Sequence, residues 1–413
     1  MSKRYEELDS LRGLASSSVV IHHTLLTSSV FLAAHYHEEI SNPLLKLFAY
    51  SPLHLFWAGH EAVILFFVLS GFVLSIPFTN RKPHYGNYVI KRVTRIYLPY
   101  IFSIALSYTL YILIQPGTHE TLSSWFNHMW SRDLTLKDIL SFILMYGEGS
   151  HNINTVIWSL VHEMRISLFF PLIMLLVNKY SWKTSLIAGV SLFSSLWLYL
   201  KIGFPKQVDS IESLNYVAHS FSMTFYYSSF FLIGALVAKN KDRLSSVFNN
   251  FSKTFKLSLI IIGTFLYTIE WWMPKVGYYR YNGNLYERLF STAIVDYAVG
   301  LSVIILFVYT LNSFRLKRIL HAKPLLILGK VSYSLYLIHP IVLLSSINLL
   351  KDILPYTAIF MLVPVISIIM AMIMYKFIEE PSMKLGKWLV GYRENRKYTI
   401  RKLIYKMREG ISW

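Results

Sequence analysis

Long apolar runs recur from one end of the 413-residue chain to the other, and they limit its fold more than any other feature. A helix needs about 20 mostly apolar residues to cross a membrane. Only 15% of the residues are charged, whereas soluble domains carry about 25%. We therefore predict an all-α fold, a polytopic membrane helical bundle of about ten transmembrane helices. Their expected positions are residues 11–33, 60–78, 96–115, 163–179, 183–203, 219–238, 255–272, 289–311, 325–349 and 355–378.

The distribution of positive charge predicts how the bundle is oriented. The formal net charge is +18, from 40 Lys and Arg against 22 Asp and Glu. With the N-terminus inside, most Lys and Arg fall in inner segments such as RKPHYGNYVIKRVTR and RLKR. Cytoplasmic loops of membrane proteins collect these residues. Both termini are therefore expected in the cytoplasm, and the basic balance gives no reason to expect a nucleic-acid partner.

A basic segment follows the last predicted span. We assign residues 1–383 to one transmembrane domain and residues 384–413 to a basic cytoplasmic tail lying on anionic membrane lipid. Pro381 is predicted to end the final helix, because proline interrupts helices. No cleavable signal peptide is evident, so the first apolar run is interpreted as a retained span.

The first span, LDSLRGLASSSVVIHH, holds ionisable residues that are costly in hydrocarbon. Arg12 and His23 are separated by a helical rise of about 16 Å. With Arg12 at the inner surface, His23 lies near the middle of the membrane, and His22 points about 100° away from it. A histidine at this depth needs a neighbouring helix or a water-filled pocket. Asp9 either pairs with Arg12 or caps the helix.

Two other segments, one at the inner surface and one in mid-span, carry polar residues of interest. Arg92 and Arg95 in KRVTRIYLPY are three apart and share a helix face at the inner surface. Arginine suits phosphate groups, although ordinary positive-inside charge is the simpler explanation of this pair alone. In VILFFVLSGFVL, Ser70 and Gly71 favour close helix packing, and an acyl-serine at Ser70 is the alternative.

Other candidates are predicted in the outer half. Glu163 is placed at the outer end of a span, near Trp158. Its carboxylate could bond sugar hydroxyls, orient a base or form an internal ion pair. Tyr333 and His339 share a later span, with His339 in its outer half.

Together these segments resemble membrane acyltransferase family 3, a family of inner-membrane O-acyltransferases. LDSLRGLASSSVVIHH resembles the family's opening Arg–His pair, FFVLSGF its second block, and KRVTR its pair of arginines. WSLVHE, GKVSYSLYLIHP and IEEP resemble its later blocks. Arg165 is a departure, because many members carry an aromatic residue there. The chain is expected to be the stand-alone form, without an appended esterase-like domain.

The resemblance implies transfer of an acyl group, commonly acetyl, from acetyl-CoA or another cytosolic acyl-CoA to a hydroxyl. The acceptor would be a glycan, a lipid-linked glycan or another extracytoplasmic molecule. His23 would act as general base and Glu163 as a second catalytic group, while Arg12, Arg92 and Arg95 would bind the donor. The supporting residues would be Asp9, Ser70, Trp158, Tyr333 and His339. No metal and no permanently bound cofactor are expected, and no oligomeric state is predicted.

Two other functions fit the same features. A proton-coupled transporter or flippase also suits ten spans with a midplane histidine and inner arginines, although no internal repeat is evident. The protein could instead present an acyl group to a partner that completes the transfer. In each case we expect a multi-pass protein of the bacterial inner membrane.

Overall fold

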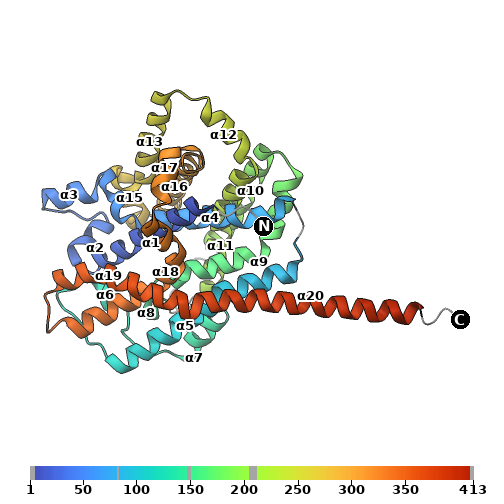
Figure 1. The fold of residues 1–413 in the computed structure, drawn as a ribbon. Helices are drawn as coiled ribbons and strands as arrows, with labels where there is room; N and C mark the ends of the chain where they lie inside the picture. The colour runs from blue at the N-terminus through green and yellow to red at the C-terminus, as the bar shows by residue number, and fades with distance from the viewer. Residues whose placement is uncertain (1–4, 81–82, 147–149, 204–211, 410–413) are drawn as a thin grey trace.

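The computed structural model describes residues 5–80, 83–146, 150–203 and 212–409. Within these ranges the elements are helices, and strand pairing is limited to one isolated bridge between Ser28 and Leu122. Figure 1 shows the helices gathered into one bundle. The predicted all-α, polytopic membrane helical bundle is confirmed.

Eight helices in the described part are long and apolar enough to cross a membrane. Two further helices, α1 (Glu6–Leu26) and α13 (Lys253–Tyr267), lie over the other two predicted spans. The eight are α4 (Gly59–Asn80), α5 (Tyr85–Ile114), α9 (Ile157–Lys179), α10 (Trp182–Gly203), α11 (Glu212–Lys239), α16 (Leu285–Asn312), α18 (Lys323–Leu350) and the continuous helix that begins with α19 (Tyr356–Met374).

Short helices connect the long ones. They are α2 (Ser29–His35), α3 (Pro43–Ala49), η1 (Pro52–Trp57), α6 (Ser124–Asn127), α7 (Leu136–Ile143), α8 (Ser150–Ile153), α12 (Lys241–Asn249), α14 (Ile269–Trp272), α15 (Pro274–Asn282) and α17 (Phe314–Leu320).

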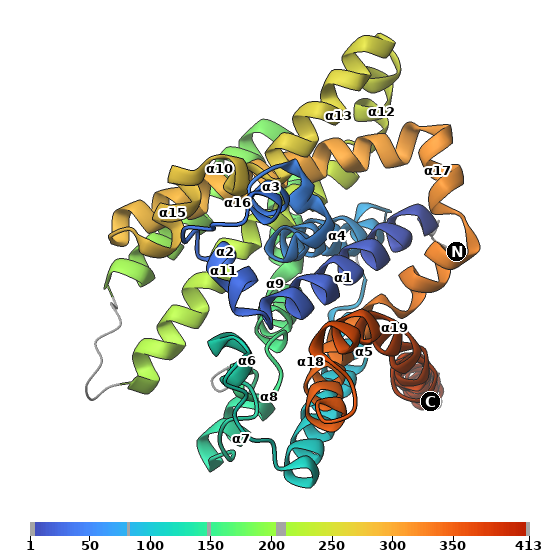
Figure 2. The ribbon, with the colours of Figure 1, turned by 90° about the vertical axis from the view of Figure 1, so that its left-hand side faces the viewer.

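The helix α1 lies in the middle of the bundle, along α18 and against α4 (Figures 1 and 2). Its serines bond to neighbouring backbone: Ser10 Oγ donates to the Leu320 carbonyl at 2.6 Å, and Ser16 Oγ to the Ser332 carbonyl at 3.0 Å. Hydrogen bonds of this kind join helices where water is absent. They explain why a helix with so polar a sequence occupies the centre of a membrane protein.

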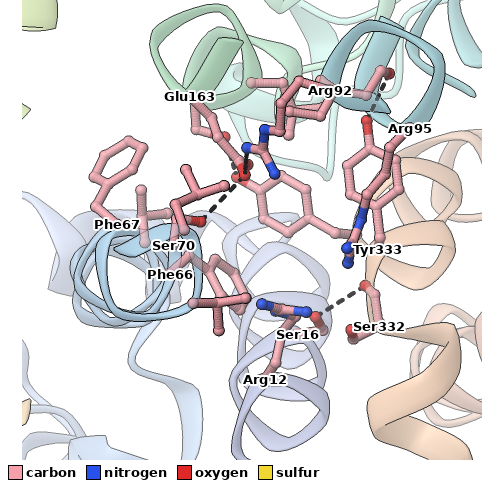
Figure 3. A pocket seen from close by; sticks show the side chains of 17 residues that line it. Arg12, Ser16, Phe66, Phe67, Ser70, Arg92, Arg95, Glu163, Ser332 and Tyr333 are labelled. Atoms are coloured by element: carbon pink, nitrogen blue, oxygen red, sulfur yellow. Dashed lines mark hydrogen bonds and ion pairs between the residues drawn. The ribbon is translucent and has the colours of Figure 1, made fainter. Parts of the chain in front are cut away.

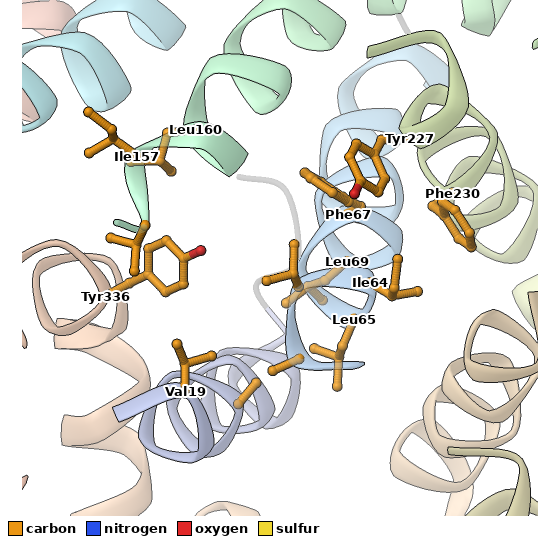
Figure 4. Packing of buried hydrophobic residues seen from close by; sticks show 14 of the residues in the cluster. Val19, Ile64, Leu65, Phe67, Leu69, Ile157, Leu160, Tyr227, Phe230 and Tyr336 are labelled. Atoms are coloured by element: carbon orange, nitrogen blue, oxygen red, sulfur yellow. The ribbon is translucent and has the colours of Figure 1, made fainter. Parts of the chain in front are cut away.

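Gly71 has the packing role expected of it. It lies where α4 crosses α11, and a Cβ atom at this position would sit 2.0 Å from the Phe231 carbonyl oxygen. Around the crossing, the ring of Phe67 lies 4.6 Å from that of Tyr227, and Ile64 lies near Phe230 (Figure 4). Only glycine permits this approach of two backbones.

We expect Gly71→Ala to destabilise the bundle. The added methyl group meets backbone atoms that cannot move aside, and overpacking of this kind costs about 1–3 kcal/mol or more. Thermal unfolding of the detergent-solubilised protein measures the effect. Gly391→Ala is the matched control, because that helical glycine has nothing within 4 Å of the added carbon. Equal melting temperatures for the two variants would contradict this account of the crossing.

The prediction that the last helix ends at Pro381 is wrong. After α19 the chain forms a π-helical turn, η2 (Tyr375–Glu379), and continues directly into α20 (Glu380–Glu409). A π-turn shifts the hydrogen-bond register, and proline is tolerated in the first turn of a helix. The predicted domain boundary at 383/384 therefore falls inside α20, which extends away from the bundle (Figure 1). Residues 410–413 of the predicted tail lie outside the described residues.

Candidate active site

A pocket between α1, α4, α5, α9 and α18 holds about 730 Å³ of empty space, part of which is open to solvent. Figure 3 shows the side chains that surround it. The apolar wall comes mainly from α4, where Phe66 and Phe67 face the space. The polar lining consists of Arg12, Ser16, Ser70, Arg92, Arg95, Ser159, Glu163, Ser332, Tyr333 and Tyr336.

Three guanidinium groups face this pocket, as Figure 3 shows for Arg12, Arg92 and Arg95. Arg92 and Arg95 come from one face of α5, and Arg12 comes from α1. Arg12 Nη1 lies 3.7 Å from Asp9 Oδ1, so the predicted Asp9–Arg12 pairing is present. The pocket therefore concentrates positive charge that suits an anionic ligand, and arginine is the residue best shaped for phosphate oxygens.

Glu163 lies among these arginines and not at the outer end of a span. The helix α9 begins at Ile157, six residues earlier than predicted, which places Glu163 within its second turn. Its Oε1 atom accepts hydrogen bonds from Arg92 Nη2 at 3.0 Å and from Ser70 Oγ at 3.1 Å. Arg92 Nη2 also donates to Ser167 Oγ at 2.7 Å. The carboxylate thus orients Arg92 and ties the wall formed by α4 to the wall formed by α5.

Two tyrosines of α18 complete the lining. Tyr333 donates a hydrogen bond to the Ile96 carbonyl at 2.8 Å, which fixes its ring beside Arg95 (Figure 3). Tyr336 is hydrogen-bonded to Ser159 at 2.8 Å, and its ring lies 6.1 Å from that of His339. Tyr336 therefore connects the arginine-lined pocket with the histidines above it.

His23 and His339 form a pair beyond the pocket lining. His23 Nδ1 lies 2.9 Å from His339 Nε2, and the two rings are nearly parallel. On α1, His23 points within about 20° of the direction of Arg12, three turns further along. His23 is half-buried, while His339 is buried. The pocket and the histidine pair thus lie along one face of the same helix.

The remaining predicted residues are separated from this face. Trp158 points to the opposite side of α9, where it lines a second pocket with His162 and Tyr227. His22 Nδ1 donates a hydrogen bond to the Trp57 backbone carbonyl at 2.9 Å. Arg165 Nη2 donates to the Met145 carbonyl at 2.8 Å. These contacts join helices and loops.

A buried charge network was missed in the sequence. Arg280 of α15 lies 2.9 Å from Glu270 Oε2 and 3.1 Å from Asp296 Oδ1, which also lies 2.7 Å from His60 Nε2. The side chains of Glu270 and Asp296 are 1% and 0% exposed. Asp296 was detectable, since an acid in the middle of an apolar run marks a polar contact. Its partners were not, because His60 and Arg280 lie on separate helices, α4 and α15.

Positive and hydrogen-bonding neighbours govern the ionisation of Glu270. Burial alone would raise the pKa of this carboxyl group, but the adjacent Arg280 guanidinium, together with His37 and His60, lowers the pKa to about 2. Glu270 is therefore ionised at neutral pH. Within the described residues, no group of three or more His, Asp or Glu is placed to hold a metal ion.

The fold and the pocket define a multi-pass membrane protein with an arginine-lined pocket between its helices. The family model described as an acyltransferase domain, family 3, matches residues 5–376. The chain belongs to this family.

Similar curated proteins cover less of the chain. The O-acetyltransferase OatA of Staphylococcus aureus strain NCTC 8325 / PS 47 is 34% identical over 140 residues, which are 33% of this chain and 21% of the relative. The OatA of strain COL gives the same values. The chain thus matches about a fifth of the length of these relatives. No solved structure gives a significant match.

Proposed function

We propose that this protein transfers an acyl group, most simply acetyl, from a cytosolic acyl-CoA to a hydroxyl of a glycan or lipid-linked glycan outside the cytoplasm. The observation that carries the proposal is the shared face of α1, which presents Arg12 to the pocket and His23 above it. An anionic donor and a neutral acceptor can then meet along one path. We place the protein in the bacterial inner membrane with both termini in the cytoplasm.

The donor would bind by its phosphates. Arg12, Arg92 and Arg95 bring three positive charges to the pocket, and Glu163 offsets one of them. Coenzyme A carries several phosphate charges, so the surplus of positive charge favours its binding. The apolar wall of Phe66 and Phe67 suits the thioester arm, which lacks charge.

His23 would act as general base. Its half-exposed ring can reach an acceptor hydroxyl, and the hydroxyl oxygen would attack the thioester carbonyl as His23 takes the proton. The leaving thiolate would then recover that proton and depart as free coenzyme A. Glu163 would assist by holding Arg92 and Ser70 in place, as a positioning residue on the donor side.

Label transfer tests the proposal. Membranes containing the protein are incubated with acetyl-labelled acetyl-CoA, and label is measured in the glycan, lipid and soluble fractions. We expect label in a glycan or lipid-linked glycan fraction as an alkali-labile ester. Membranes with the Arg92→Met/Arg95→Met protein are the control, in which loss of donor binding abolishes labelling. Substrate uptake without any labelled ester would instead support a transporter, and label that stays on the protein would support an acyl-presenting role.

A further inference from the structure

The contacts of His339 determine where its proton lies. Its side chain is 1% exposed, and Nδ1 lies 3.1 Å from the backbone carbonyl of Leu335, one turn earlier in α18. A carbonyl oxygen only accepts hydrogen bonds, so Nδ1 of His339 must carry a proton. In the neutral ring the other nitrogen, Nε2, then has only a lone pair.

His339 is neutral on structural grounds. It forms no salt bridge with any described residue, and its helix is buried on all sides around it. A charged side chain buried without a partner is costly, and membrane interiors increase that cost. Its Nε2 atom therefore accepts a hydrogen bond and cannot donate one.

The tautomer of His23 follows from this constraint. His23 Nδ1 lies 2.9 Å from the lone pair on His339 Nε2, and two lone pairs cannot form a hydrogen bond. His23 must donate from Nδ1. In neutral His23 the lone pair is consequently on Nε2, the nitrogen that points away from His339.

We propose that His339 is a positioning residue that fixes His23 in the tautomer able to accept a proton at Nε2. This inference rests on the proposed function of His23 as general base. During transfer, Nε2 takes the proton of the acceptor hydroxyl as its oxygen bonds to the acyl carbon. The carbon–sulfur bond breaks, and the thiolate takes the proton from Nε2. His339 stays neutral throughout and accepts the Nδ1–H bond of the transient imidazolium.

Two substitutions at His339 separate this role from simple packing. In His339→Gln the side-chain oxygen can occupy the position of Nε2 and still accept from His23, whereas His339→Leu removes the acceptor and keeps a similar apolar volume. We expect kcat to fall by about 10²- to 10⁴-fold in His339→Leu, the range found when a catalytic histidine loses its base function or its tautomer partner. His339→Gln should stay within about tenfold of the wild type. The KM for acetyl-CoA should change little in either variant.

Nitrogen-15 NMR of the wild-type full-length chain in lipid nanodiscs tests the tautomer without any folding risk. The His23 signals are assigned by their loss in His23→Gln. We expect a protonated Nδ1 and an unprotonated Nε2. A protonated Nε2 would overturn the inference, and so would wild-type kcat in a folded His339→Leu protein when His23→Ala is inactive. Normal transfer by His23→Ala would overturn the proposed function itself, and that result distinguishes the two failures.

Discussion

His23→Ala will abolish acyl transfer while the protein still inserts and folds. General acid–base catalysis contributes about 10²- to 10⁴-fold to such reactions, and no other histidine lies on the face of α1 that leads from the pocket. The His23 side chain is half-buried, and among the described residues its one side-chain hydrogen bond is to His339, so its removal leaves few contacts unmet. Label incorporation from acetyl-CoA measures transfer, and size-exclusion chromatography measures folding.

The neighbouring histidine provides a matched control. His22 sits next to His23 on the same helix, but its Nδ1 atom bonds to the Trp57 carbonyl at 2.9 Å and its ring stacks on that of Trp57. In His22→Asn the amide nitrogen can replace this donor, and we expect transfer to continue. Near-normal transfer in His23→Ala would remove His23 from the mechanism.

Among the variants proposed for this protein, Arg280→Met will lose the most stability. Arg280 links two carboxylates that are almost completely buried, those of Glu270 and Asp296. Removing one partner from a buried ion pair leaves an uncompensated charge and costs about 3–5 kcal/mol. Chemical unfolding in detergent micelles measures the change in the free energy of unfolding. Arg288→Met is the control, because Arg288 is exposed. Surface substitutions usually change the free energy of unfolding by no more than about 0.5 kcal/mol.

Two further measurements sharpen this test. Glu270→Gln in the Arg280→Met background should recover part of the lost stability, because it removes one unpaired buried charge. If the double variant is no more stable than Arg280→Met, the loss does not come from the charge on Glu270. In the wild type, the pKa of Glu270 is lowered from 4.5 to about 2. Its contribution to stability is therefore complete above about pH 4.5 and is lost as the pH falls toward 2.

The ends of the helices show where prediction from the sequence pattern fails. The run at 289–311 predicts α16 to within four residues, because its apolar length allows few alternatives. The first span was extended to residue 33, but α1 ends at Leu26 and a separate helix follows. The stop at Pro381 was wrong because a π-turn before the proline keeps the helix continuous. Apolar length determines that a helix forms, whereas local hydrogen bonding determines where it ends.

The candidate site, too, was predicted only in part: the sequence indicated its residues but not their contacts. Family-like segments singled out Arg12, Arg92, Arg95 and Glu163 in the sequence, yet Glu163 was expected at the outer end of its span. Packing of α9 against α5 put its carboxylate 3.0 Å from Arg92 instead. A helix has many faces, and a single sequence does not state which one meets which neighbour.

The sequence by itself determined that this chain is a membrane helical bundle with ionisable residues inside it, because hydrocarbon admits only long apolar helices and makes each buried charge conspicuous. Only the tertiary structure decided the partners of those residues. His23 and His339 are 316 positions apart, and Arg280 meets Asp296 because the short helix α15 packs against α16. Such contacts depend on how helices cross and rotate against each other, which side-chain packing sets over the whole bundle.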